Sequence, residues 1–286
     1  MKKETIMTRQ RLEHMIRLGA KKLQDPYYQG SAAEIAFYLL LSIVPTLILL
    51  SQVLGLFSVS LDSIREWLNP DLIHVEGADM ILSMLDYSPS GVNSVFLALT
   101  AVWAASRAQF TMLRITNYTL SDGHSTGMGY VRDRIRSLKT VVITVFTIGF
   151  SLVILVYGEL LLKVLFGIVI GSEMAEKTWM LIRWPIAAGL YFLMISYNYY
   201  VLPTHRVPYR AVVPGSLFAS IGLMVVTGVY SIYTSVSSSY DILYGSFSNF
   251  VALMFWFYLL SWVLFLGVIL NKVWWETRSD VSRDRD

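Results

Sequence analysis

Six long apolar segments, separated by shorter polar ones, dominate the chain. A helix needs about 20 apolar residues to cross a hydrocarbon core of roughly 30 Å. Each segment meets this length, so the pattern predicts an all-α integral membrane protein with six transmembrane helices. The predicted spans cover approximately residues 31–57, 92–118, 140–166, 179–202, 211–233 and 245–271.

Polar sequence flanks and interrupts this membrane domain, which extends over residues 31–271. Residues 1–30 mix cations with apolar residues at helical spacing, which predicts a basic amphipathic helix on an anionic membrane face. The charged residues of 58–90 are acidic except for Arg65, and two groups of apolar residues recur at helical spacing, which predicts short amphipathic helices in the first external loop. The charged tail, 272–286, is expected to be frayed.

The positive charges are distributed unevenly between the two sides that six spans define. One side receives residues 1–30, 107–139, 202–210 and 272–286. These segments hold all but four of the 23 Lys and Arg residues, the exceptions being Arg65, Lys163, Lys177 and Arg183. The positive-inside rule therefore predicts that both termini lie in the cytoplasm.

Composition supports the membrane class and excludes several chemistries. Hydrophobic residues make up 55% of the 286 positions, charged residues only 15%, and the mean hydropathy is +0.54. Soluble domains carry about 25% charged residues. The absence of cysteine excludes disulfides, thiolate catalysis and Cys-ligated metals. The first 30 residues predict no cleaved signal peptide, and no base-reading pattern accompanies their charge, so no nucleic-acid partner is expected.

The residue pattern does not favour an enzyme. Zinc-protease and nucleotide-binding motifs do not occur in the sequence. No carboxylate cluster with metal-ligand spacing accompanies the four scattered histidines, which are His14, His74, His124 and His205. We therefore expect no catalytic residues, no metal and no cofactor.

One face of the first predicted span is polar. Its members fall within roughly 80° of one another around a helix; they are Glu34, Tyr38, Ser42, Pro45 and Gln52. Such a face must lie against protein or water rather than lipid. It either lines a path for a solute or bonds neighbouring helices, and Glu34, near the start of the span, alternatively lies among the lipid headgroups.

Pro45 predicts a kink near the middle of the same helix. Proline has no backbone N–H, so the Leu41 carbonyl is left without its helical partner. Ser42 stands next to this break, and its hydroxyl is expected to bond the freed carbonyl.

Three further polar residues belong to the predicted pathway. Arg107 and Arg114 share one face of the second predicted span. Arg107 lies about 22 Å into that helix. It is either a cation that snorkels toward the cytoplasm, or an anion-binding residue that faces Glu34 or a substrate headgroup. Asn198 is a polar residue within the fourth predicted span.

Three stretches resemble signatures of the YihY/BrkB family of bacterial inner-membrane proteins. They are AAEIAFYLLLSIVP from Ala32, VPYRAVVPG from Val207, and YGSFSNFVALMFWFYLLSWVLFLGVILN from Tyr244. The family-motif residues are Pro214, Gly215, Tyr244, Gly245, Trp256, Gly267 and Asn271. The family often ends with Gly-Ala-Glu-Leu-Asn, whereas Ile269 stands here in place of the acid. A mechanism that needs this carboxylate therefore does not carry over.

The resemblance implies a multi-pass protein of the bacterial inner membrane. Some members of the family are linked to transport of lipid-like envelope components or to serum resistance, and an older ribonuclease label of some members has no support in these residues. The first functional hypothesis is a transporter, exporter or flippase of a lipid-like or amphiphilic substrate. The alternative is a non-transporting scaffold that organises envelope lipids or partner proteins. The expected partners are membrane lipids, with a second copy of the chain or a partner membrane protein.

Overall fold

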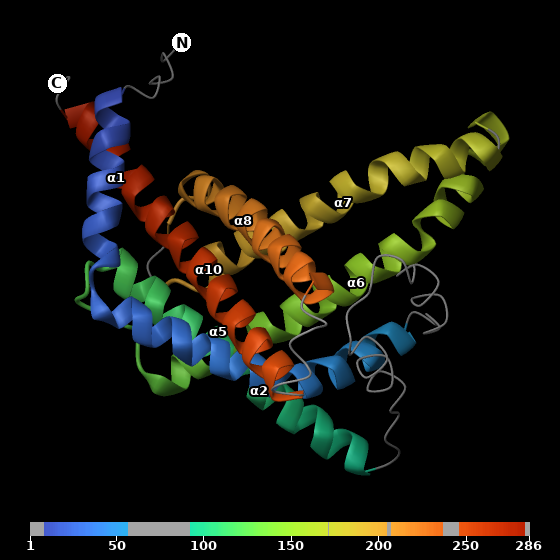
Figure 1. Cartoon of the computed structure of the whole chain (residues 1–286), viewed down its shortest axis with the longest axis horizontal. Helices are drawn as coiled ribbons and strands as arrows, with labels where there is room; N and C mark the ends of the chain where they lie inside the picture. The colour runs from blue at the N-terminus through green and yellow to red at the C-terminus, as the bar shows by residue number, and fades with distance from the viewer. Residues whose placement is uncertain (1–8, 57–91, 171, 205–206, 237–245, 284–286) are drawn as a thin grey trace.

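In the part of the chain that it describes, the computed structural model consists of helices and short connections, without β-strands (Figure 1). It describes residues 9–56, 92–170, 172–204, 207–236 and 246–283. The helices are α1 (Arg9–Leu23), α2 (Pro26–Leu56), α5 (Val92–Leu120), α6 (Tyr130–Ile170), α7 (Ser172–Val201), α8 (Tyr209–Val236) and α10 (Ser246–Arg283). A helix pairs its own backbone N–H and C=O groups, which is the condition for entering lipid.

The predicted all-α class is confirmed, and each predicted span coincides with one long helix. Within the described ranges, three stretches are long and apolar enough to cross a membrane, namely Lys177–Val201 in α7, Tyr209–Tyr233 in α8 and Phe250–Arg278 in α10. The total of six spans stays a prediction. The amphipathic helices expected in 58–90 lie outside the described residues.

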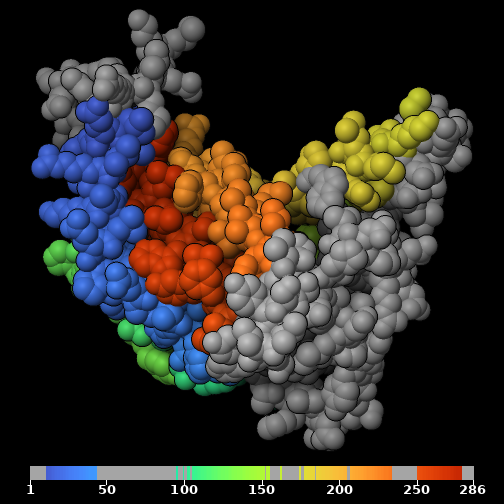
Figure 2. Space-filling view, viewed as in Figure 1, coloured from blue at the N-terminus to red at the C-terminus, as the bar shows by residue number. Residues whose placement is uncertain are grey.

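Four of the helices are arranged around α10 (Figure 1). This helix contacts α1, α2, α5 and α8, while α2 packs along α5. A long hairpin is formed by α6 and α7, and it diverges from the other helices toward its tip (Figure 1). Figure 2 shows the molecular surface hollowed between α8 and α7.

The helix predicted in residues 1–30 is confirmed as α1, and it packs on the end of α10. Arg11 stacks on the Trp274 ring, with 4.6 Å from Cζ to the ring centroid, and its Nε donates to Thr277 Oγ1 at 3.3 Å. Leu12 and Ile16 remain exposed on the other side. One face of α1 is therefore used for protein contact, and the membrane position of the helix stays a prediction.

The expectation of a frayed tail is wrong for most of residues 272–286. α10 continues without interruption to Arg283, and its last turns carry the contacts to α1. We call this end of the bundle the terminal end. It comprises α1, the start of α2, the α5–α6 connection and the last turns of α10.

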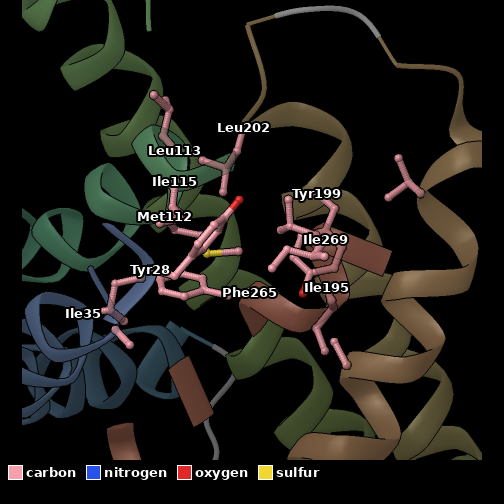
Figure 3. Packing of buried hydrophobic residues seen from close by; sticks show 14 of the residues in the cluster. Tyr28, Ile35, Met112, Leu113, Ile115, Ile195, Tyr199, Leu202, Phe265 and Ile269 are labelled. Atoms are coloured by element: carbon pink, nitrogen blue, oxygen red, sulfur yellow. The ribbon is translucent and has the colours of Figure 1, made fainter. Parts of the chain in front are cut away.

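A cluster of buried apolar side chains lies beside the terminal end, where α2, α5, α7, α8 and α10 meet (Figure 3). Leu113, Leu202 and Phe265 are completely buried there. Away from this junction apolar side chains point outward, and Leu181 of α7, for example, is 77% exposed. Outward-facing apolar side chains suit a surface in contact with lipid. Moving such a side chain from lipid to a contact with another helix gains little free energy, because the lipid is itself apolar.

Four residues hold α7, α8 and α10 close together, and two of them are glycines. A Cβ added at Gly215 would strike the Gly267 carbonyl oxygen and the Asn271 side chain, and a Cβ at Gly267 would strike the Tyr199 hydroxyl. Asn271 Oδ1 accepts a hydrogen bond from Gly215 N at 2.6 Å, and the Tyr199 hydroxyl donates to the Leu264 carbonyl at 2.6 Å. Three of the family-motif residues, Gly215, Gly267 and Asn271, therefore form one interhelical contact.

Replacing Gly215 by Ala is expected to destabilise the protein by about 1–3 kcal/mol, the usual cost of overpacking a fitted interface. Gly228→Ala, in the same helix, is the control because an added Cβ there meets nothing within 4 Å. Alanine is the better helix former, so this control should be as stable as the parent or slightly more stable. Thermal unfolding in detergent measures both, and equal melting temperatures for the two variants would contradict the close contact.

Candidate functional site

The polar face predicted for the first span lies against α5. Glu34, Tyr38 and Ser42 follow one another at intervals of four along α2, so they lie on one side of it. The Thr111 hydroxyl of α5 lies 2.9 Å from Glu34 Oε1. One turn away, the Arg107 guanidinium stands over the Tyr38 ring, with 5.4 Å from Cζ to the centroid. The structure thus brings together Glu34, Tyr38 and Arg107.

The remaining members of this face are described only in part. Ser42 is buried, and its hydroxyl donates to the Leu39 carbonyl at 2.9 Å. The predicted bond from Ser42 to the Leu41 carbonyl is therefore wrong. Pro45 and Gln52 lie within α2, but their side chains are outside the described set. A water-lined path along the whole face stays a prediction.

Arg107 lies level with the start of α6. The Phe110 ring of α5 meets the ring of Tyr130, the first residue of α6, at 5.6 Å between centroids. Arg134, one turn into α6, stacks on Trp103 at 3.9 Å from Cζ to the ring centroid. The last turns of α5 therefore extend past the start of α6 toward the terminal end. The depth of Arg107 in a membrane stays a prediction.

Arg134 is a functional candidate that the sequence analysis missed, because it was counted only among the cations of a loop. It is 5% exposed, and its Nη2 donates to the Trp103 carbonyl at 3.2 Å. Burial, and then the positive charge of Arg107, lower the pKa of Arg134. The spacing does indicate this burial. Arg134, Ser137 and Val141 follow at intervals of three and four, so they share one helix face, and all three are buried.

Asn198 belongs to a different interface. Its Nδ2 lies 2.9 Å from the Met194 carbonyl and 3.3 Å from Thr144 Oγ1, so it joins α7 to α6. Arg114 is half-buried on α5, two turns closer to the terminal end than Arg107. The predicted pathway residues thus divide between an α2–α5 group and an α6–α7 contact.

The terminal end holds a second polar cluster. Asp122, in the α5–α6 connection, accepts hydrogen bonds from Lys22 of α1 at 2.6 Å and from Lys272 of α10 at 2.9 Å. Beside it, burial raises the pKa of Tyr28 to about 12, so its hydroxyl is neutral where it bonds Thr119 at 3.0 Å. The cluster borders a polar cavity of about 620 Å³ and ties three elements together.

Two apolar grooves open on the other helices. The first, about 650 Å³ in volume, lies between α8 and α10. Trp256 lines it and stacks on Tyr230 at 5.1 Å between ring centroids. The second, about 480 Å³, lies between α6, α7 and α8, where Figure 2 shows the hollow. Both walls consist mostly of aliphatic and aromatic side chains.

In the described ranges, no group of three or more His, Asp or Glu side chains is placed to hold a metal ion. His14 borders the terminal cavity, and His124 Nδ1 lies 2.7 Å from the Ser121 carbonyl. His74 and His205 lie outside the described residues.

Helices that face outward with apolar side chains, and three stretches able to cross a bilayer, define a multi-pass membrane protein. The family model for virulence factor BrkB matches residues 20–286, and the chain belongs to that family. It is accordingly a multi-pass bacterial membrane protein, as the resemblance of its motifs implied. The family is one of membrane proteins and is not a recognised enzyme family.

Individual relatives differ in how much of the chain they match. The ribonuclease-like protein YfkH of Bacillus subtilis (strain 168) is 27% identical over 250 residues, covering 86% of this chain and 89% of YfkH. A UPF0761 membrane protein of Pseudoalteromonas translucida (strain TAC 125) is 33% identical over 75 residues, covering 26% of this chain and 24% of the relative. Another UPF0761 membrane protein, from Xanthomonas oryzae pv. oryzae (strain PXO99A), is 36% identical over 101 residues, covering 35% of this chain and 23% of the relative. The chain thus spans about a quarter of the length of these UPF0761 relatives. No solved structure matches it.

The ion pairs of Asp122 predict a pH dependence of stability. Burial alone would raise the pKa of Asp122, but the hydrogen bonds and charges of Lys22 and Lys272 outweigh it, and the net shift is downward. A carboxyl whose pKa is lower in the folded protein stabilises it above the unfolded value of about 3.9, and this stabilisation is lost as the pH falls through the folded pKa.

Asp122→Asn is therefore expected to lower stability by about 1 kcal/mol, a small value because the Asp122 side chain is 50% exposed. Melting temperatures of the parent and the variant should differ by a constant amount from pH 8 to about pH 5, and the difference should shrink below about pH 4. A difference in melting temperature that persists unchanged at pH 3, or is absent at pH 7, would contradict a stabilising role for the Asp122 ion pairs.

Proposed function

We propose that this protein is a transporter, exporter or flippase that moves a lipid-like or amphiphilic substrate. The observation that carries the proposal is the meeting of Glu34, Tyr38 and Arg107 between two helices of a mostly apolar domain. Ionisable side chains in a membrane domain cost free energy, and as a rule they mark the path of a solute.

The two apolar grooves favour an amphiphile over a small ion. Their volumes, about 650 and 480 Å³, are those of sites that accept drug-sized molecules. Aliphatic and aromatic walls suit a hydrocarbon chain, whereas the polar contacts between α2 and α5 suit a headgroup. A substrate with both parts would use both features.

A non-transporting scaffold is the second candidate. The same polar contacts also tie helices pairwise, as Thr111 does for Glu34 and Thr144 for Asn198. A scaffold needs such contacts only for packing, and it would organise envelope lipids, a second copy of the chain or a partner membrane protein. The two functions differ in whether water reaches the Glu34 face.

For the topology we propose six spans, at the residues predicted above, with both termini in the cytoplasm. Residues 1–30 and 272–286 are then cytoplasmic segments that flank the membrane domain. Support comes from the three apolar stretches of α7, α8 and α10, from the long helices at the other three predicted positions, and from the uneven distribution of Lys and Arg.

Single cysteines test this topology without background labelling, because the chain has none of its own. His124→Cys lies in the α5–α6 connection and Met174→Cys at the start of α7, both at exposed positions. In intact spheroplasts an impermeant thiol reagent is expected to label Met174→Cys only, and to label both after permeabilisation. Labelling of His124→Cys from outside would contradict the proposed orientation.

Transport is tested in liposomes that contain the purified protein and a fluorescent phospholipid analogue. The protein is expected to accelerate movement of the analogue between leaflets, and Glu34→Gln and Arg107→Ala are each expected to abolish the acceleration while expression and insertion stay intact. Glu13→Gln makes the same chemical change as Glu34→Gln at an exposed position of α1, and should keep the parent rate.

Parent rates in both pathway variants would remove Glu34 and Arg107 from the path. A parent protein that accelerates no amphiphile would favour the scaffold. The experiment therefore separates an error in the residues from an error in the function.

A further inference from the structure

Arg134 is a buried cation whose hydrogen-bonding capacity is only partly used. Its Nη2 has the Trp103 carbonyl as acceptor, but Nε and Nη1 have no hydrogen-bond partner among the described residues. Stacking on Trp103, at 3.9 Å from Cζ to the centroid, covers one side of the guanidinium. A buried charge without a counter-charge is costly, and an anion nearby would relieve the cost.

Arg107 stands next to Arg134. Trp103, Arg107 and Phe110 occupy one face of α5 at intervals of four and three. Arg134 contacts the rings on both sides of Arg107, since its Cζ lies 3.9 Å from the Trp103 centroid and 5.8 Å from that of Phe110. Two like charges therefore lie beside the same pair of rings, one buried and one half-buried. Arg107 is only half-buried, so its guanidinium can be reached from outside.

Two acidic residues near the arginines form hydrogen bonds with other groups. Glu34 accepts the Thr111 hydroxyl, and Asp133, which precedes Arg134, accepts from Met128 N at 3.3 Å. Within the described ranges, neither arginine forms an ion pair with a carboxylate. The pair thus presents a net positive charge without a carboxylate counter-charge among the described residues.

The surface beside the arginines is apolar and runs along the same helix. Val95, Leu99 and Trp103 follow at intervals of four and lead directly to Arg107; they are 62%, 66% and 50% exposed. We call them the apolar stripe. A free anion would gain nothing from this stripe, whereas a phospholipid would lay an acyl chain on it with its phosphate at the arginines.

We propose that Arg107 and Arg134 form a binding site for the anionic headgroup of a phospholipid, with the apolar stripe of α5 receiving its acyl chain. Arg107 makes the direct contact, because it is the more exposed of the two arginines. Its guanidinium offers two parallel N–H donors to a phosphate. Arg134 lies behind it and supplies a second positive charge shielded from water. The inference concerns binding at rest, so it stands whether the protein transports or only organises lipids.

The test titrates the full-length protein, in a neutral detergent, with fluorescent phosphatidylglycerol and with phosphatidylcholine that has the same acyl chains. Anisotropy measures binding. The parent is expected to prefer the anionic lipid by about tenfold, the value of one charge-assisted contact. Arg107→Gln and Arg134→Gln should each remove the preference. Arg132→Gln removes the same charge at an exposed position of α6 and should keep it.

Thermal unfolding first shows whether each variant folds, since Arg134 is buried and its replacement affects stability. If Arg134→Gln does not fold, Arg107→Gln, at a half-buried position, decides the result. Equal affinity of the parent for the two lipids, or an unchanged preference in Arg107→Gln, overturns the inference. Loss of preference in Arg132→Gln as well overturns a specific site in favour of general surface charge. Displacement of the lipid by millimolar inorganic phosphate overturns the choice of a lipid as the ligand.

Discussion

The close approach of α8 to α10 at Gly215 and Gly267 is the constraint on which the rest of the packing depends. α10 touches α1, α2, α5 and α8, so its position determines theirs. In lipid there is little hydrophobic gain from bringing helices together, and association relies on tight contact and interhelical hydrogen bonds. The two glycines permit the contact, and Asn271 completes it by accepting the Gly215 N–H.

Polarity changes along the molecule in three stages. The terminal end carries paired charges, with Asp122 between two lysines. Next come Arg107 and Arg134, which are stacked on aromatic rings but lack ion pairs within the described ranges. Beyond them lie apolar grooves and outward-facing aliphatic side chains. A phospholipid has the same order of polarity, which agrees with the lipid ligand proposed above.

The helices and their approximate bounds could be predicted from the sequence, because long apolar segments allow few alternatives. The polar face predicts that Glu34 and Tyr38 lie against protein or water, since such a face is unfavourable in lipid, but it does not identify α5 as the neighbour. Periodicity identifies the residues that share a face, but not how far one helix is displaced along its neighbour. For that reason the level of Arg107 and the burial of Arg134 required the structure. The order of the tail was missed because its charges do not reveal the docking of Arg11 on Trp274.

The unbroken course of α10 has a mechanical consequence. Its 38 residues give a length of about 57 Å, nearly twice the hydrocarbon thickness of roughly 30 Å. No loop absorbs motion between the part that packs on α8 and the part that binds α1. Any tilt of the part of α10 that packs on α8 is therefore transmitted to α1 at its other end, where a small rotation becomes a larger displacement.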